Sequence, residues 1–305
     1  MKTFLKEKMK ILLIGSKGQL GSELNISLRN HGEIIESDRS KLDLENLDKI
    51  PLYIEEINPA IIINASAYTN VEEAEDNEKL ASKINYEAVS IFAKISKKLN
   101  ILLIHFSTDY VFDGTKNDPY IEDDLPCPIN IYGKTKLEGE KAIQESGCSY
   151  YIFRVSWLIG NYGNNFAKKI IYFAKNQENL KVIDDQMGVP TSPKLISEVM
   201  NHLIKSYEGN YRWEYGIYNL NPRGKASWFI IAKFIINFIN EMDNKNSYLV
   251  KSVQPVSTND FKTKAKRPIN SLLDNSKLEK VLGYDLNNWE SYFINDLKEI
   301  LHNSF

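Results

Sequence analysis

Residues 11–21 read ILLIGSKGQLG, an apolar run that leads directly into a loop rich in glycine. The apolar residues 11–14 are typical of a strand buried on both faces. A G-x-x-G-x-x-G loop after such a strand, with a helix predicted over 19–30, lets backbone N–H groups approach a pyrophosphate, whose charge the helix N-terminus stabilises. The candidate dinucleotide-binding residues of this stretch are Gly15, Gly18, Gln19, Leu20 and Gly21.

Apolar runs and helical patterns alternate through the first half of the chain, as in the βαβ units of a parallel sheet. The further strands predicted there are Ile34–Ser37, Ala60–Asn64, Ile101–Ser107 and Tyr151–Val155, with helices near 45–57, 78–98 and 132–146. After about residue 157 the pattern loosens into helices near 164–176, 193–206, 226–241 and 288–302, with short strands at Lys181–Ile183 and Gly216–Leu220. The predicted fold class is α/β, a doubly wound parallel sheet (Rossmann) with a smaller mixed α/β lobe.

The length of 305 residues suggests two domains, at about 150 residues per domain. We expect a dinucleotide-binding domain over 9–157 and a mainly substrate-binding lobe over 158–305, with some segments of the second part returning to the first. Because Met9 is followed at once by a lysine and the first apolar run, residues 1–8 are predicted to be a dispensable lead.

Composition excludes several classes of function. The chain has 38 Lys and Arg against 40 Asp and Glu, so it lacks the basic excess of a nucleic-acid binder. The first apolar run is too short for a signal peptide, which needs about 7–15 apolar residues, or for a membrane span, which needs about 20. The two cysteines, Cys127 and Cys148, have no zinc-ligand spacing. We expect a cytoplasmic protein whose partner is a small molecule rather than nucleic acid or membrane.

Asp38 follows the second predicted strand, 17 residues beyond Gly21, where an acid can bind an adenosine ribose hydroxyl. A carboxylate there favours NADH because it repels a 2′-phosphate. Arg39 and Lys17 have the opposite effect, since either cation can pair with that phosphate and admit NADPH. The sequence leaves NADPH or NADH open.

Two further segments are predicted to approach the cofactor. Asp43 and Leu44 follow a short loop and can flank the adenine, although Asp43 suits a helix N-cap equally well. Ala65, Ser66 and Ala67 end the third strand with small side chains, which would let the chain pass close to the cofactor or pack ordinarily.

The predicted catalytic residues are Thr108, at the end of a buried strand, and Tyr132 and Lys136 in a Y-x-x-x-K pattern. Residues four apart share one face of a helix, so the ammonium can lie close to the phenol. A free tyrosine with a pKa near 10 is a poor proton donor at neutral pH, and a neighbouring cation lowers that pKa. Together the three side chains suit a reductase. A solvated helix face is the alternative.

The motif order G-x-x-G-x-x-G, N-A-x-A-Y-T, S-T-D-Y-V-F-D-G and Y-G-x-T-K-x-x-G-E resembles the extended short-chain dehydrogenase/reductases. More narrowly, it is similar to their dTDP-4-dehydrorhamnose reductase family. The likeness extends through F-R-V-S-W from residue 153, D-Q-M-G-V-P-T from 185 and R-P-I-N-S from 267, and so covers nearly the whole chain from Met9. It implies transfer of a hydride from NADPH or NADH to the C4 carbonyl of dTDP-4-dehydro-L-rhamnose, within the synthesis of nucleotide sugars and cell-surface polysaccharides.

The resemblance also implies roles for individual residues. Tyr132 would donate a proton to the C4 oxygen, Lys136 would tune Tyr132 and contact the nicotinamide ribose, and Thr108 would complete the triad. The implied substrate contacts come from Thr108, Asp109, Trp157, Asn165 and Arg267. Without the resemblance, Trp157 suits a buried core, Asn165 a turn and helix cap, and Arg267 an ordinary surface position.

A magnesium ion and a dimer are the features that the resemblance supports least. Members of that family form a dimer linked by magnesium through carboxylates, and Glu23 alone falls near a matching position. The expected oligomeric state is therefore a monomer or a homodimer.

Two other functions remain open at this point. One is another nucleotide-sugar reductase or an epimerase of the same superfamily. A dehydratase is disfavoured, because Asp109 is followed by Tyr110 instead of the second acid that elimination of water needs. The other is a reductase-like regulatory subunit without catalysis, which retention of Thr108, Tyr132 and Lys136 argues against.

Overall fold

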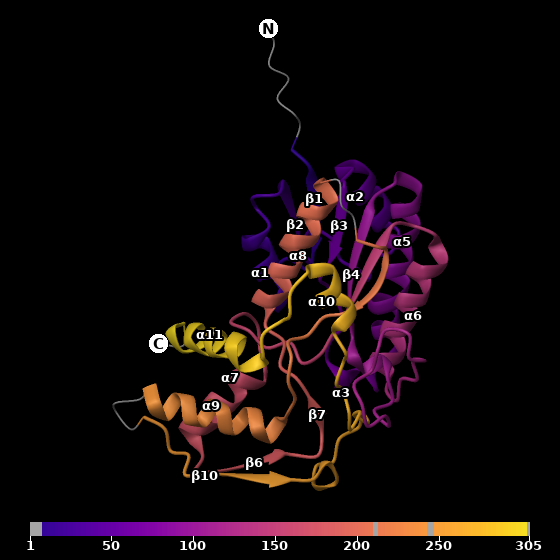
Figure 1. Cartoon of the computed structure of the whole chain (residues 1–305). Helices are drawn as coiled ribbons and strands as arrows, with labels where there is room; N and C mark the ends of the chain where they lie inside the picture. The colour runs from indigo at the N-terminus through magenta and orange to yellow at the C-terminus, as the bar shows by residue number, and fades with distance from the viewer. Residues whose placement is uncertain (1–7, 210–212, 243–246, 304–305) are drawn as a thin grey trace.

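The computed structural model describes residues 8–209, 213–242 and 247–303. At its centre lies a parallel sheet of six strands in the order β2-β1-β3-β4-β5-β8 (Figure 1). The strands are β1 (Lys10–Ile14), β2 (Glu33–Ser37), β3 (Ile61–Asn64), β4 (Leu102–Thr108), β5 (Tyr150–Val155) and β8 (Gly216–Asn219). The predicted doubly wound sheet is confirmed. The lead predicted over 1–8 lies outside the described residues, apart from Lys8.

Alternate residues of the strands face opposite layers of helices, as the period of a strand requires. One layer contains α1 (Gln19–Ser27) and α8 (Pro193–Glu208), which pack on residues such as Leu13 and Ile63. The other contains α2 (Lys49–Ile57), α5 (Ala88–Leu99) and α6 (Ile131–Ser146), which pack on residues such as Leu12 and Ile62. Both faces of the sheet are therefore buried, which explains why its strands are nearly continuous apolar runs.

The helix predicted over 78–98 is interrupted by a π-helical turn. It consists of α4 (Glu78–Ser82), the turn Lys83–Glu87 and α5. Asn85 lies in this turn, and its side chain accepts a hydrogen bond from the Tyr68 nitrogen and donates to the Thr135 hydroxyl, at 2.8 and 3.1 Å. The turn thus directs one buried amide toward both the loop after β3 and helix α6.

The smaller lobe lies on the side of the sheet away from the N-terminus (Figure 1). It contains α7 (Phe166–Asn176), α9 (Trp228–Met242) and α11 (Trp289–His302), which share one apolar core. Two short sheets complete it: β6 (Asn179–Ile183) pairs with β10 (Ser252–Val256), and β7 (Met187–Gly188) pairs with β9 (Ala226–Ser227). Shorter helices are α3 (Val71–Ala74) and α10 (Ser276–Leu282), and two 3-10 turns span Asp109–Val111 and Thr258–Asp260.

Strand β8 belongs to the main sheet, although the sequence pattern grouped it with the smaller lobe. It pairs in parallel with β5 and extends the edge of the sheet. Some of the second part of the chain therefore returns to the first, while the division at residue 157 stays a prediction.

Candidate active site

A cavity of about 790 Å³ opens at the carboxyl ends of the central strands, where ligands bind in open α/β sheets. Most of the predicted site residues line it: Gly15, Gly18, Gln19, Leu20, Asp38, Arg39, Asp43, Leu44, Ala65, Ser66, Ala67, Thr108, Asp109, Tyr132, Lys136, Trp157 and Asn165. Of the other predicted residues, Gly21 and Arg267 are absent from its wall. Sequence reasoning missed about half of the lining residues, among them Tyr68, Phe166 and Trp228.

The glycine loop has the shape that a dinucleotide needs. Gly15 has a φ of 80°, and a Cβ there would lie 2.8 Å from the Ser66 nitrogen, so a side chain would fill the cradle. A Cβ at Gly21 would lie 2.0 Å from the Gly15 carbonyl oxygen. Gly21 therefore serves the cradle indirectly, by letting helix α1 begin against the loop.

Asp38 lies on the cavity wall between partners that stabilise its charge. It forms an ion pair with Lys17 and accepts hydrogen bonds from the Ser40 nitrogen and hydroxyl. The Lys17 ammonium, followed by the Ser40 hydroxyl, holds the pKa of the Asp38 carboxyl well below its usual range. Arg39 is 77% exposed and pairs with Glu45. An acid and two cations therefore surround the place predicted for the adenosine ribose.

Asp43 does not cap helix α2. The helix begins at Lys49 with Asp48 in the N-cap position, while Asp43 accepts a hydrogen bond from the Glu45 nitrogen at 3.2 Å. The helix-cap alternative for Asp43 is therefore excluded. Asp43 lies on the cavity wall, next to buried Leu44.

Helix α6 brings Tyr132 to the end of β4. The helix begins with an Asn130 cap, whose side chain accepts from the Gly133 nitrogen at 2.8 Å. A Cβ at Gly133 would lie 2.1 Å from the Tyr110 carbonyl oxygen, so glycine allows the helix to pack against the turn that follows β4. Burial raises the pKa of Tyr132 to about 12, and its hydrogen-bonding contact with the Thr108 hydroxyl opposes that rise. A phenol in this state needs a nearby cation to release its proton.

Lys136, which the sequence predicts to be that cation, lines the same cavity and is almost fully buried. Its Nζ donates to the Phe106 carbonyl oxygen at 2.6 Å and lies 3.2 Å from Nε2 of His105. Burial lowers the pKa of Lys136 to about 8. Burial therefore favours the uncharged amine at Lys136 more than at an exposed lysine.

Asp109 is buried beside the same hydroxyl. The Thr108 hydroxyl donates to Asp109 Oδ1 at 2.9 Å, and Oδ2 has no hydrogen-bond partner. Burial raises the pKa of Asp109 to about 7. An unpaired oxygen on a cavity-lining carboxyl is suited to accept a hydrogen bond from a bound hydroxyl group.

Trp157 forms an aromatic wall together with a residue that the sequence did not single out. Its ring stacks on Trp228, with centroids 3.7 Å apart and an angle of 12° between the planes. Trp157 has a φ of 36°, which is rare outside glycine, and a Cβ at Gly188 would lie 2.5 Å from its ring. Trp157 is thus buried, as the core alternative expects, and it also lines the cavity, while its contact with the substrate stays a prediction.

Asn165 caps a helix and joins the two lobes. Its side chain accepts from the Lys168 nitrogen at the start of α7 and donates to Gln19 Oε1 at 2.8 Å. Gln19 in turn accepts from the Gly160 nitrogen and donates to the Leu158 carbonyl oxygen, at 3.1 and 3.0 Å. A residue of the glycine loop is therefore bonded to the loop of the smaller lobe, and the substrate contact of Asn165 stays a prediction.

Arg267 lies near Tyr110 and is paired with an acid. Its Nη2 donates to Glu72 Oε1 on helix α3 at 3.1 Å, while its Nε is buried without a partner. Glu72 also accepts from the Lys264 nitrogen at 2.9 Å. A free surface position is thus excluded, and the diphosphate contact stays a prediction.

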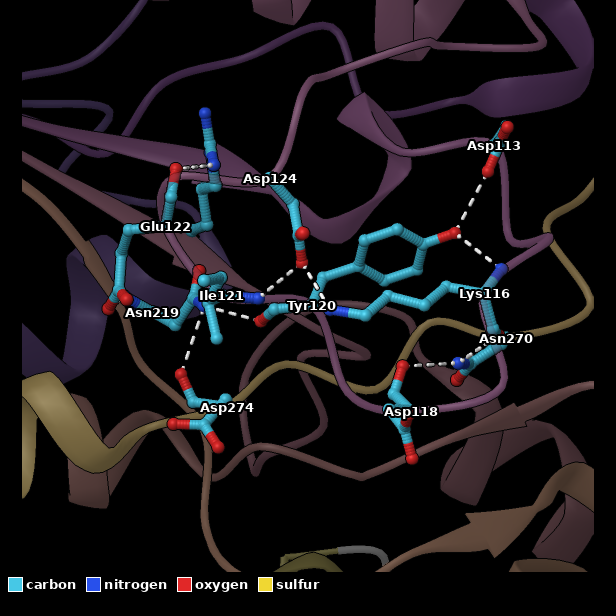
Figure 2. Close-up of polar contacts among 11 residues, drawn as sticks. Asp113, Lys116, Asp118, Tyr120, Ile121, Glu122, Asp124, Asn219, Asn270 and Asp274 are labelled. Atoms are coloured by element: carbon cyan, nitrogen blue, oxygen red, sulfur yellow. Dashed lines mark hydrogen bonds and ion pairs between the residues drawn. The ribbon is translucent and has the colours of Figure 1, made fainter.

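The segment that follows the Asp109–Val111 turn is held by contacts within itself and with distant parts of the chain, as Figure 2 shows. The Tyr120 hydroxyl donates to Asp113 at 2.8 Å, and Lys116 forms an ion pair with Asp124. Asn270 donates to the carbonyl oxygens of Lys116 and Asp118, and Asn219 donates to that of Tyr120, at 2.8 to 3.0 Å. These bonds fix the backbone on the far side of Thr108 and Asp109.

Glu23 is half-buried on helix α1, where burial raises its pKa and Lys194 opposes the rise. Within residues 8–209, 213–242 and 247–303, no group of three or more His, Cys, Asp and Glu side chains could hold a metal ion. A magnesium site is therefore not supported. In the same part of the chain, no helix has the length and apolar character required to cross a membrane.

Known proteins resemble this chain over nearly its whole length. A family model described as the RmlD substrate binding domain matches residues 9–303. A dTDP-4-dehydrorhamnose reductase of Burkholderia thailandensis is 35% identical over 284 residues, which are 92% of this chain and 95% of that protein. The crystal structure of a dTDP-4-dehydrorhamnose reductase from Bacillus anthracis in complex with NADP has a TM-score of 0.85 at 35% identity, and covers 94% of this chain and 99% of its own. The crystal structure of a dTDP-4-dehydrorhamnose reductase from Clostridium acetobutylicum has a TM-score of 0.87 at 35% identity, and covers 95% of this chain and 99% of its own.

Proposed function

The chain belongs to the RmlD family, and on that premise we propose that it is a dTDP-4-dehydrorhamnose reductase whose catalytic residues are Tyr132, Lys136 and Thr108. The reaction reduces the C4 carbonyl of dTDP-4-dehydrorhamnose to an alcohol, with NADPH or NADH as the reductant. The observation that carries the assignment of residues is the meeting of these three side chains with the glycine loop in one cavity.

The proton and the hydride reach the carbonyl from different sources. A bound nicotinamide supplies the hydride for the carbonyl carbon. The Thr108 hydroxyl would turn its proton from Asp109 to the carbonyl oxygen and so hold it. The Tyr132 hydroxyl would give that oxygen a proton, so that the ketone becomes an alcohol and Tyr132 becomes a phenolate. The Lys136 ammonium stabilises this phenolate by its charge. Because the tyrosine pKa is raised by burial, the reaction depends on that cation.

The remaining cavity residues suit the two ends of the ligands. Asp38 would accept the adenosine ribose hydroxyl, and Arg39 would pair with a 2′-phosphate, so we expect NADPH and NADH both to be used. Asp109 would accept a sugar hydroxyl, and the paired rings of Trp157 and Trp228 would form an apolar wall for the sugar.

The decisive assay follows the loss of reduced-nicotinamide absorbance with dTDP-4-dehydro-L-rhamnose generated enzymatically from dTDP-glucose. Tyr132→Phe keeps the ring and removes the proton, and should lower kcat by about 10²–10⁴-fold. Tyr172→Phe, on the exposed face of α7, is the matched control and should retain activity. No turnover by the wild type would refute the function, whereas full turnover by Tyr132→Phe would refute the mechanism.

The cytoplasmic location and the choice between monomer and homodimer stay predictions. Cell fractionation tests the first, and sedimentation of the purified protein tests the second.

A further inference from the structure

A chain of polar side chains, half-buried at its first residue and buried at the other three, joins the cofactor end of the cavity to Lys136. It runs through Ser66, Asn64, His105 and Lys136, and we call these four residues the polar chain. Asn64 and His105 are paired across β3 and β4, with Asn64 Nδ2 3.0 Å from His105 Nδ1. His105 Nε2 lies 3.2 Å from Lys136 Nζ. Asn64, His105 and Lys136 are each at most 1% exposed, so these contacts are shielded from bulk water.

The direction of the hydrogen bonds is fixed at the Ser66 end. The backbone N–H of Ser66 can only donate, and it points at the side-chain oxygen of Asn64, with a separation of 3.1 Å. The Ser66 hydroxyl lies 2.6 Å from the same oxygen and donates to it as well. Two donors on one side therefore hold the Asn64 oxygen toward Ser66, and the amide NH₂ group must point toward His105.

This orientation decides where His105 carries its proton. The Asn64 NH₂ group donates to Nδ1, so Nδ1 must present a lone pair. Burial lowers the pKa of His105 well below its ordinary value, which keeps the imidazole neutral. A neutral imidazole without a proton on Nδ1 carries it on Nε2, and this N–H points at Lys136.

We propose that His105 is a positioning residue that presents an N–H to Lys136 and so favours the amine over the ammonium. A neutral Lys136 amine can accept a hydrogen bond from the His105 N–H while it donates to the Phe106 carbonyl oxygen. A Lys136 ammonium has no lone pair, so its N–H groups and the His105 N–H would face each other as donors. Protonation of Lys136 to the ammonium that Tyr132 needs therefore breaks the hydrogen bond with His105. As the pH rises, Lys136 loses this proton at a lower pH than an ordinary lysine does.

The charged groups around Lys136 do not cancel this effect. Glu140, one turn further along α6, is the acid that acts on Lys136, but it is bound by Arg154 of β5 through three contacts of 2.8 to 3.3 Å. Among the residues that the structure describes, Lys136 is the charged group that acts on His105, and its charge helps to lower the pKa of the imidazole. The balance between amine and ammonium is therefore set by burial and by the polar chain.

The proton position can be measured directly by ¹⁵N NMR of histidine-labelled protein. The chain has four histidines, and the signals absent from His105→Gln identify those of His105. We expect an unprotonated Nδ1 and a protonated Nε2 in the folded wild type. A protonated Nδ1 would overturn the proposal. Because this measurement needs no substrate, its result stands whether or not the proposed function is correct.

The effect on Lys136 rests on the proposed function and is tested by the pH dependence of kcat. Asn64→Asp still accepts from Ser66 but cannot donate to Nδ1, so the His105 proton should move to Nδ1 and Nε2 should accept from the ammonium. His105→Gln can turn an amide oxygen toward Lys136 without adding charge. In both variants the pH at which activity falls on the alkaline side should rise by about one unit or more. A lower kcat with an unchanged alkaline midpoint in both would show a merely structural role and overturn the proposal.

Discussion

Among the residues that the structure describes, two lysine or arginine side chains are buried, and their surroundings differ. Arg154 and Lys136 are 2% and 1% exposed. The Arg154 guanidinium is held by the Glu140 carboxylate, donates to the Glu122 carbonyl oxygen at 3.1 Å and lies over the Phe112 ring. Lys136 has neutral partners, a backbone carbonyl and an imidazole. No directly paired acid therefore offsets the free-energy cost of burying the Lys136 charge.

The difference separates a structural charge from a reactive one. A guanidinium locked to a carboxylate keeps its proton and fixes α6 against β5. A lysine without such an acid has its pKa lowered by burial, so its proton is available near neutral pH. Lys136 and Glu140 lie four residues apart on the same helix, so one element provides both kinds of site.

The largest expected effect comes from removing Glu140, the acid that pairs with Arg154. Glu140→Gln leaves the Arg154 charge buried without its partner and should lower the free energy of unfolding by about 3–5 kcal/mol. Chemical denaturation measures the change. Glu145→Gln, on the exposed part of the same helix, is the control and should stay within about 0.5 kcal/mol of the wild type. Equal effects of the two variants would contradict a structural role for the pair.

Removing the Lys136 cation should lower activity without lowering stability. Lys136→Met takes away a charge that is costly to bury, so the free energy of unfolding at pH 7 should hold or rise. The kcat should fall by about 10²–10⁴-fold, because the Tyr132 phenolate loses its cation. Parallel denaturation and turnover measurements test this split. A loss of stability as large as that of Glu140→Gln would refute it.

The pH dependence of stability sharpens the same contrast. The pKa of Lys136 is about 8 in the folded protein and about 10.5 in the unfolded chain, so the unfolded state binds more protons between these values. Stability then rises with pH, and the cost of burying the ammonium, about 3 kcal/mol, is fully present below pH 8 and fades toward pH 10.5. Denaturation of the wild type and Lys136→Met at pH 7, 8, 9 and 10 should show the gap closing. A constant gap would contradict the lowered pKa.

The smallest effect is expected at an exposed cation. Arg39→Ala should lower kcat/KM with NADPH by about two- to fivefold relative to NADH, because an exposed ion pair contributes at most about 1 kcal/mol. Lys41→Ala is the matched control, since this exposed neighbour does not line the cavity. An unchanged ratio of NADPH to NADH activity in Arg39→Ala would exclude a contact with the 2′-phosphate.

Local patterns, together with the family resemblance, predicted the sheet and about half of the residues that line the cavity. Strands buried on both faces are continuous apolar runs, and a four-residue spacing is enough to place Tyr132 and Lys136 on one face. The partners of the buried charges could not be predicted in this way. His105 lies within an apolar strand 31 residues before Lys136, and Glu72 lies 195 residues before Arg267. These contacts depend on how strands and helices pack, which no spacing along the chain encodes.

Strand β8 has a consequence for the order in which the protein is made. A ribosome releases the chain from its N-terminus, so β1 to β5 emerge well before the residues that complete their sheet. Until residue 219 has left the exit tunnel, β5 is an open edge, and the apolar face that later receives Leu220, Leu278 and Leu282 is uncovered. The half of the chain that contains β1 to β5 is therefore the first part to be synthesised, but its sheet is complete only after much of the smaller lobe has been made.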